Sequence, residues 1–305
     1  MSEMNNKTEP LVSVRILTYN SSKYIVETLE SVYFQTYSNI ELIISDDCSS
    51  DNTVQVCRNW IKNKGSRFKR VELLTSIVNT GVCANSKRSL EATKGDYIKG
   101  LGGDDCLYPS AIEEYVRFMK EKYVEICAAK MKYMDDDSND YDIKPGYTYD
   151  NYIKELKLSY KQQLCLINQR LFVPGPVLFY SRKIYLETGG PDEEFGAADE
   201  WSFIYKVIKK GYRIFGLEKE LVRYRIRRGS LCRDGKNNKE LPYYKRCSSL
   251  FISKVILPNL LREKKYIMYW HMYITHLMWG KSYLYRYLRL IDPLWYLGKI
   301  YLFRV

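Results

Sequence analysis

Short apolar runs, rich in β-branched residues, alternate with longer stretches of helical character over the first 120 residues of this 305-residue chain. The expected strands are 11–20, 39–47, 70–76 and 96–101, and the expected helices are 21–35, 49–65 and 81–95. A serine is expected to cap the first helix, and Ser50 or Asp51 the second. Strands that alternate with helices in this way form a parallel sheet with helices on both faces. The alternation therefore predicts an α/β fold.

Polar residues stand where three of these strands end. They are TYN at 18–20, SDDCSSD at 45–51 and GGDD at 102–105. Ligands of parallel α/β sheets bind outside the carboxyl ends of the strands. We therefore expect a ligand site where the three polar stretches meet.

Two adjacent carboxylates, Asp104 and Asp105, follow the fourth strand. Two like charges on a stretch about to be buried are unfavourable unless a partner compensates them. Mg²⁺ and Mn²⁺ bind through one or two carboxylates together with the phosphates of a substrate, and such an ion would neutralise charge on a departing diphosphate. A turn or a helix N-cap ahead of Pro109 would use the same residues, so both interpretations stay open at this point.

Four stretches carry a family resemblance by their order and spacing. They are VSVRILTYNSSKYIVETLESVYFQTYSNIELIISDDCSSDNT, NTGVCANSKRSLEATKGDYIKGLGGDD, TGGPDEEFGAADEWSFIYKVIKKGYRI and VRYRIRRGS. The chain resembles the family 2 glycosyltransferases of GT-A fold, continuously over 11–122 and again at the last two stretches. The resemblance implies a Rossmann-like mixed sheet with helices on both faces and a catalytic domain over 1–240. Residues 11–122 would form the nucleotide-sugar-binding half and residues 123–240 the acceptor-binding half.

The resemblance also assigns a nucleotide site to the ends of the strands. The residues that it assigns to this site are Thr18, Tyr19, Asn20, Asp47, Asn79, Gly81, Asn85 and Lys87. Asp47 would accept the N3 proton of uracil, and residues 18–20 would line the base and ribose pocket. On the residues alone, Gly81 is equally compatible with a helix cap and Lys87 with a surface charge.

The metal motif of the family is Asp-x-Asp, often within Leu-Asp-Ala-Asp-Asp, and it corresponds here to Leu101 through Asp105. Gly102 replaces the first aspartate of the motif. The resemblance therefore makes Asp104 the expected ligand of Mn²⁺ or Mg²⁺, with Asp105 in support.

Inverting transfer needs a general base that takes the proton of the acceptor hydroxyl. The family places a carboxylate for this task at the start of a helix, which corresponds here to ADEWSF. Glu200 has the position of the catalytic aspartate, and Asp199 is the alternate. On the residues alone, both carboxylates could simply interact favourably with a helix dipole. This helix is expected to lead into an edge strand.

Arginines follow the last core strand. Arg225, Arg227 and Arg228 could bind the pyrophosphate of the donor or of a lipid acceptor, because a guanidinium donates in pairs to phosphate oxygens. Arginines exposed to solvent are the alternative.

The C-terminal part of the chain is basic and aromatic. From Lys206 onward, 23 Lys+Arg stand against 6 Asp+Glu, a formal charge of +17 within a total of +12. The run 266–280 has no charged residue and is too short to span a membrane. We expect 241–305 to form a helical appendage whose tyrosines and tryptophans lie at lipid head groups, with a helical dimer interface as the alternative. The eight scattered cysteines and the polar N-terminus favour a cytoplasmic protein, peripheral on the inner face of the plasma membrane.

Together, these observations predict an inverting glycosyltransferase. It would move one sugar from a nucleotide diphosphate donor, expected to be UDP-linked, to a glycan acceptor, expected to be lipid-linked, in the synthesis of a cell-surface polysaccharide such as O-antigen or capsule. The competing hypothesis is a catalytically inactive GT-A-like membrane scaffold, since Gly102 replaces an expected ligand. Nucleic acid is not an expected partner, because no base-stacking module is recognisable in the sequence.

Overall fold

A computed structural model describes residues 9–141, 152–226 and 243–277. The chain divides into two compact units, residues 1–228 and 229–305. The predicted domain boundary at residue 240 lies outside the described residues.

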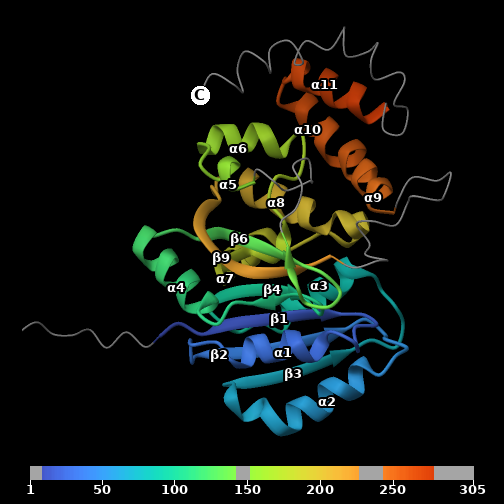
Figure 1. The fold of residues 1–305 in the computed structure, drawn as a ribbon. Helices are drawn as coiled ribbons and strands as arrows, with labels where there is room; N and C mark the ends of the chain where they lie inside the picture. Colours follow the sequence, from blue (N-terminus) through green and yellow to red (C-terminus); the bar gives the residue numbers. More distant parts are fainter. Residues whose placement is uncertain (1–8, 142–151, 227–242, 278–305) are drawn as a thin grey trace, which may run out of the picture. The chain divides into compact units, whose positions relative to one another are not determined.

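Within the described part of the first unit, nine strands form one mixed sheet (Figure 1). The strand order is β3-β2-β1-β4-β8-β6-β9-β5, and β7 pairs with β6. The strands are β1 (Val12–Thr18), β2 (Ile40–Asp46), β3 (Arg70–Thr75), β4 (Tyr97–Gly102), β5 (Cys106–Leu107), β6 (Ile126–Met134), β7 (Asp140–Tyr141), β8 (Leu178–Ser181) and β9 (Phe215–Arg225). Strands β1 to β4 are parallel to one another, and β8 runs antiparallel to both β4 and β6. The predicted α/β fold with a mixed sheet is confirmed.

The face of the sheet that each of the first three helices covers follows from the order in which the chain forms the strands. They are α1 (Ile25–Tyr33), α2 (Thr53–Lys64), α3 (Val82–Glu91), α4 (Ala111–Lys122), α5 (Tyr152–Glu155), α6 (Tyr160–Ile167), α7 (Arg182–Thr188) and α8 (Asp199–Lys209), with 3₁₀ turns η1 (Gly65–Arg67), η2 (Gly175–Val177) and η3 (Glu193–Ala198). The chain moves outward from β1 through β2 to β3 and then returns to β4, so right-handed crossovers place α1 and α2 on one face and α3 on the other. Accordingly, α1 packs on α2, whereas α3 packs on η3.

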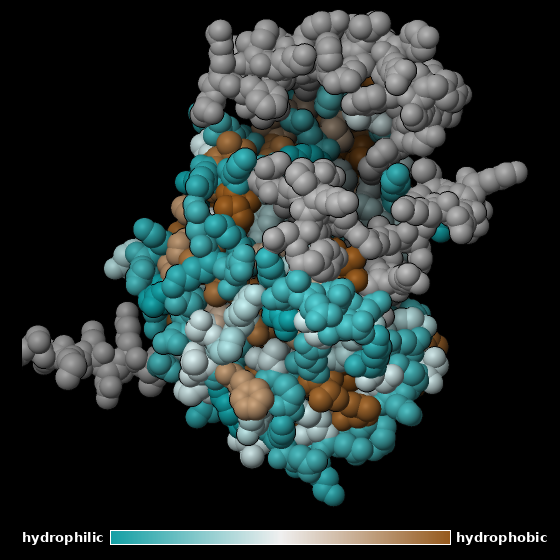
Figure 2. All heavy atoms as spheres, viewed as in Figure 1, coloured by the Kyte–Doolittle hydropathy of each residue, from teal (hydrophilic) through white to brown (hydrophobic). Residues whose placement is uncertain are grey.

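Hydrophobic side chains of β1 and β2 form the centre of the core. Val12, Val14, Ile16 and the run Leu42 to Ile44 have no exposed surface. On the face shown in Figure 2, hydrophilic side chains cover most of the described surface of the first unit. All residues of β2 are buried, because both faces of the sheet are covered, and this explains the unbroken apolar run from Leu42 to Ile44.

Three local predictions were wrong. No serine caps the first helix, which begins at Ile25 because the carbonyl of Ser21 accepts the N–H groups of Tyr24 and Ile25 in a preceding turn. Strand β9 is not an edge strand, because the two-residue strand β5 pairs with it on the side away from β6. The N-cap of the second helix is Asn52, which makes no side-chain capping hydrogen bond, and not Ser50 or Asp51; Asp51 lies one residue earlier and its Oδ1 accepts the Thr53 N–H at 2.9 Å.

The described part of the second unit is helical. It consists of α9 (Tyr243–Phe251), a π-helical turn (Ile252–Ile256), α10 (Leu257–Arg262) and α11 (Tyr266–Leu277). The π turn directly precedes Pro258, which lacks the N–H that a continuous α-helix would need there. Among the described residues, no helix is both long and apolar enough to cross a membrane.

Candidate active site

The three polar stretches predicted from the sequence meet at one edge of the sheet, which we call the rim. Thr18 at the end of β1 pairs with Asp46 of β2, and the preceding Leu17 pairs with Gly102 of β4. The Asp47 N–H donates to the Thr18 carbonyl at 3.0 Å, and the Gly103 N–H donates to the Leu17 carbonyl at 2.7 Å. Parallel pairing therefore brings residues 18–20, 45–51 and 102–105 side by side.

The end of β1 fixes the loop that follows β2. Asn20 adopts a left-handed conformation, and its Oδ1 accepts the Ser50 N–H at 2.9 Å. Tyr19 is exposed at the rim, whereas Thr18 Oγ1 is buried and has no hydrogen-bond partner among the described residues. The rim thus offers an aromatic surface close to an unsatisfied hydroxyl.

Asp47 joins this loop to the start of α3. Its buried carboxylate accepts the N–H groups of Thr80 and Gly81 and the Thr80 hydroxyl, at distances of 2.5–3.0 Å. Arg88 of α3 lies 3.5 Å from the same carboxylate. Both oxygens of Asp47 are therefore engaged within the protein, and its predicted contact with uracil stays a prediction.

The other residues assigned to the nucleotide site have different surroundings. Asn79 is exposed and its Oδ1 accepts the Gly81 N–H at 3.1 Å, while Gly81 has a φ of 87° that suits glycine at the start of α3. Asn85 is buried and pairs with Ser45 of β2 at 2.6 and 3.0 Å. Lys87 forms an exposed ion pair with Glu193 of η3 at 2.8 Å. Asn85 therefore holds α3 on the sheet, and Lys87 connects two surface elements.

Asp104 and Asp105 lie in different environments although they are adjacent. Asp105 is buried, and its Oδ1 accepts the Arg225 N–H at 3.0 Å. Burial, followed by the charge of Asp104, raises the pKa of Asp105 well above its usual value. Asp104 is only partly buried and lies at the rim. Asp105 thus secures β9, and Asp104 is the carboxylate of the pair that a cation can reach.

Gly102 leaves the space that Asp104 uses. A Cβ built on Gly102 would lie 2.8 Å from Oδ1 of Asp104, which is closer than carbon and oxygen tolerate. The glycine that replaces the first aspartate of the motif therefore leaves room for the side chain of the second aspartate, Asp104.

The described residues fit a cation that is held mainly by its ligand. No group of three His, Cys, Asp or Glu side chains gathers as a metal site in the described part of the chain. Mg²⁺ and Mn²⁺ can bind through one or two carboxylates and complete their shell with substrate phosphates and water. Asp104 supplies such a carboxylate, and Gly103 directly before it lies against the unsatisfied Thr18 hydroxyl of the neighbouring strand.

A second carboxylate pair lies at the N-terminus of α8. The N–H groups of the first turn lower the pKa of Asp199, and the N–H of Gly175 in η2, which lies against the Glu200 carboxyl group, lowers that of Glu200. Burial raises the pKa of Asp199 to about 6, whereas burial and the charge of Asp199 raise the pKa of Glu200 to about 8. Arg15 of β1 opposes both shifts. At neutral pH the pair can therefore hold one proton and accept another.

Arg225 has a structural position. Its side chain has no exposed surface, forms an ion pair with Glu27, and donates to the carbonyls of Asp104 at 3.0 Å and Asp135 at 2.7 Å. It therefore does not present its guanidinium to a phosphate here, because its donors hold β9 against the rim. Arg227 and Arg228 lie outside the described residues.

Sequence reasoning missed two basic residues in the strands, of which Arg15 is partly buried and Lys99 is fully buried. Arg15 of β1 donates to the hydroxyls of Ser86 and Ser89 of α3 at 3.0 and 3.1 Å. Lys99 of β4 is fully buried, donates to backbone carbonyls and lies with its ammonium 5.5 Å from the centre of the Tyr115 ring. The available signal was a single charge in the middle of each of two apolar strands.

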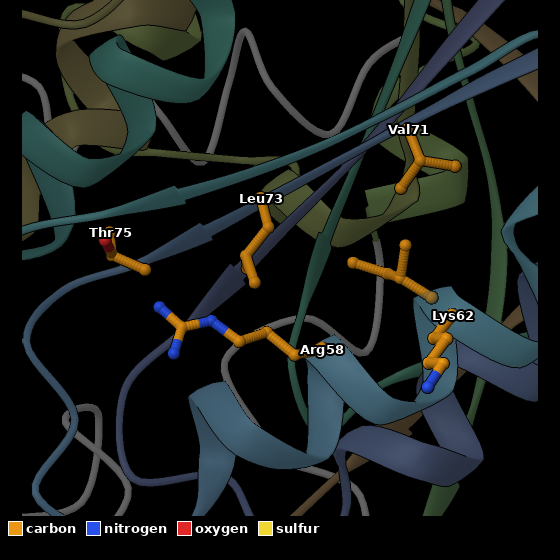
Figure 3. Close-up of a pocket in the computed structure, with 6 residues that line it drawn as sticks. Arg58, Lys62, Val71, Leu73 and Thr75 are labelled. Atoms are coloured by element: carbon orange, nitrogen blue, oxygen red, sulfur yellow. The ribbon is translucent and has the colours of Figure 1, made fainter.

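A pocket of about 410 Å³ lies apart from the predicted site (Figure 3). It is lined by Arg58, Ile61, Lys62, Val71, Leu73 and Thr75, which belong to α2 and to the edge strand β3. None of the predicted site residues lines it.

Comparisons with known proteins agree with this geometry. The family described as "Glycosyl transferase family 2" matches residues 13–189. The chain is 31% identical over 132 residues to "Glycosyltransferase GlyG" of Streptococcus pneumoniae serotype 4, covering 43% of this chain and 42% of that protein. It is 37% identical over 107 residues to a chondroitin synthase of Escherichia coli, covering 35% of this chain and 15% of that protein. In three of its curated relatives, GlyG among them, this chain covers half or less of the relative's own length.

A solved structure shares the fold. It is the structure of residues 1–349 of Staphylococcus aureus TarS in complex with UDP-GlcNAc, with a TM-score of 0.64 and 20% identity over 88% of this chain and 72% of that one.

Proposed function

The chain belongs to glycosyltransferase family 2, and we propose that it transfers one sugar from a UDP-linked donor to a glycan acceptor with inversion at the anomeric carbon. The observation that carries this proposal is the position of Asp104. It is a partly exposed carboxylate at the carboxyl end of β4, on the rim where β1 and β2 also end. An α/β sheet of this kind binds its ligands at that edge.

The donor side of the proposal assigns roles to the rim. Tyr19 and Thr18 would contact the base and ribose, and Asp47 would keep the segment before α3 in place. Asp104 would hold Mn²⁺ or Mg²⁺, which would supply neutralisation of charge on the departing diphosphate. The relative of known structure was solved with UDP-GlcNAc, which supports a UDP-linked donor.

The acceptor side needs a proton acceptor. Glu200 is our candidate base, with Asp199 as the alternate. Its raised pKa makes the ionised carboxylate a stronger base than an ordinary glutamate. The first helical turn and Arg15 stabilise a negative charge on the pair, so Asp199, with a pKa of about 6, is ionised at neutral pH, and Glu200, with a pKa of about 8, becomes the ionised base as the pH rises toward 8.

The acceptor itself is inferred from the second unit. Helix α11 exposes Tyr266, Ile267, Trp270, Tyr273 and Leu277, which recur at helical spacing. Exposed aromatics next to a strongly basic C-terminal region suit the head-group layer of an anionic membrane. We therefore propose a lipid-linked acceptor at the cytoplasmic membrane surface, in the synthesis of a surface polysaccharide. Similarity to a chondroitin synthase supports a polysaccharide product.

Calorimetric titration of UDP, with and without Mn²⁺, tests the donor site. Wild type should bind UDP more tightly with Mn²⁺ than without it. In Asp104→Ala, this gain in UDP affinity should be at least tenfold smaller. Glu121→Ala, which removes an exposed carboxylate of α4, is the matched control. UDP that fails to bind under any of these conditions would contradict the proposal and favour the inactive scaffold.

A further inference from the structure

Lys99 is a buried cation that the proposed chemistry leaves without a task. It lies in the middle of β4 with no exposed surface. Its ammonium donates to the carbonyls of Gly100 at 3.1 Å, of Leu178 at 3.3 Å and of Pro176. Burial of a lysine costs free energy, so we expect its hydrogen bonds to stabilise the surrounding structure.

Two of these three carbonyls belong to one turn. Pro176 lies within η2, and Leu178 directly follows it. The carbonyl between them, that of Val177, accepts the hydroxyl of the buried Tyr115 at 2.9 Å. Lys99 and Tyr115 together therefore hold three consecutive carbonyls at the end of η2.

The opposite end of the same turn contacts the candidate base. The Gly175 backbone lies against the Glu200 carboxyl group, and its N–H lowers the pKa of that carboxyl. A Cβ built on Gly175 would overlap that carboxyl group, so the turn and the side chain are in direct contact. A shift of η2 would therefore change both the position and the hydrogen bonding of Glu200.

We propose that Lys99 is a positioning residue that holds η2 so that the Gly175 N–H fixes the Glu200 carboxylate for proton transfer. This inference rests on the proposed function for its catalytic meaning, because it assumes that Glu200 is the base. It adds a buried residue on the nucleotide-binding half of the chain that controls a carboxylate on the acceptor-binding half.

The charges near both groups favour an action through the turn. Asp199 and Arg15 face Glu200, while Asp105, Arg15 and Cys127 face Lys99. Burial lowers the pKa of Lys99 to about 7, and Asp105 opposes this shift only in part. The contact between the two groups therefore runs through the hydrogen bonds of η2.

Titration of Glu200 tests this link without any turnover. Carboxyl carbon NMR of the ¹³C-glutamate-labelled full chain gives the pKa of Glu200, and Glu200→Gln identifies its signal. Lys99→Met should raise that pKa by about one unit, because the ionised carboxylate loses the Gly175 N–H. The matched control is Tyr37→Phe, which removes a 2.6 Å hydrogen bond to the Pro10 carbonyl, away from η2. An unchanged Glu200 pKa in Lys99→Met would overturn the proposal.

Turnover measurements test whether Lys99 also affects catalysis. With UDP-GlcNAc as donor and water as acceptor, Lys99→Met should lower kcat about tenfold or more and leave the donor KM within threefold. In the Glu200→Gln background, Lys99→Met should change kcat less than threefold, because the base that Lys99 positions is already absent. A further tenfold loss of kcat in the double variant would mean that Lys99 acts independently of Glu200, in a merely structural role, and would contradict the inference.

The two possible failures are distinguishable. A wild-type chain without turnover on UDP-linked donors contradicts the proposed function, whereas the Glu200 titration still decides whether Lys99 positions Glu200. If Lys99→Met does not fold, Tyr115→Phe releases the neighbouring Val177 carbonyl and should raise the Glu200 pKa in the same direction. No shift in that variant would also contradict the proposal.

Discussion

Two acidic pairs, Asp104–Asp105 and Asp199–Glu200, look alike in the sequence and differ in the structure. In the first pair, one carboxylate is buried under the Arg225 backbone and the other lies at the rim. In the second pair, both carboxylates lie at the start of α8, where helical N–H groups, the Gly175 N–H and Arg15 surround them. In the proposed function, the first pair would thus be divided between structure and ligand binding, whereas the second would share a proton. The difference shows that local sequence does not assign roles to adjacent carboxylates, because their neighbours come from distant strands.

The largest expected effect is on turnover at the second pair. Glu200→Gln keeps the size of the side chain and removes the proton acceptor, so we expect kcat to fall by about 10²–10⁴-fold. Release of UDP from a sugar donor, followed over time, measures this change. The matched variant Asp199→Asn should lose less activity. A larger loss in Asp199→Asn than in Glu200→Gln would exchange the roles of the two residues.

The next effect is on stability at the first pair. Asp105→Leu would leave the buried Arg225 N–H without its acceptor, so the free energy of unfolding should fall by about 1–3 kcal/mol. Asp105→Asn retains an oxygen acceptor and should lose clearly less. Urea unfolding of both variants measures the difference. Equal losses would mean that the Asp105–Arg225 hydrogen bond contributes little to stability.

The second pair should make stability depend on pH. The pKa of Glu200 rises from 4.5 to about 8 on folding, so between these values the folded chain holds a proton that the unfolded chain has lost. The free energy of unfolding therefore falls as the pH rises through this window. Glu200→Gln has no such proton, and at pH 8 it should exceed wild type by on the order of 1–3 kcal/mol.

Urea unfolding of wild type and Glu200→Gln at pH 5 and pH 8 measures this change. The advantage of the glutamine variant should be small at pH 5 and grow by pH 8. An advantage that is the same at both pH values would show that Glu200 is not a buried, protonated group in the folded chain.

The sequence predicted the sheet and its rim because both depend on local patterns. Apolar runs such as 40–46 specify strands, and polar residues at strand ends mark the ligand edge of a parallel sheet. The pattern does not specify which distant element covers a side chain. Arg225 was therefore expected at a phosphate and is instead buried, and β9 was expected at an edge although β5 pairs with it.

The two basic residues inside the strands illustrate the same limit. Arg15 and Lys99 each interrupt an apolar strand, which signals an unusual environment, but their partners lie about 70 to 80 residues away in the chain. A hydrogen bond over that separation depends on how the crossovers stack, and no local propensity encodes it. The roles of both residues consequently became visible only in three dimensions.

The smallest expected effect concerns Gly102, where the family motif has an aspartate. Gly102→Asp restores the letters of the motif, yet its Cβ would lie 2.8 Å from Oδ1 of Asp104 and 3.3 Å from Oδ2 of Asp105. The new side chain should displace Asp104 and add a like charge, so Mn²⁺-dependent UDP binding should weaken about threefold to tenfold instead of improving. Calorimetry with UDP and Mn²⁺ measures this, and Gly102→Ala separates the steric part from the charge. Tighter binding by Gly102→Asp would mean that the rim can accommodate a second carboxylate, and that the glycine weakens the cation site.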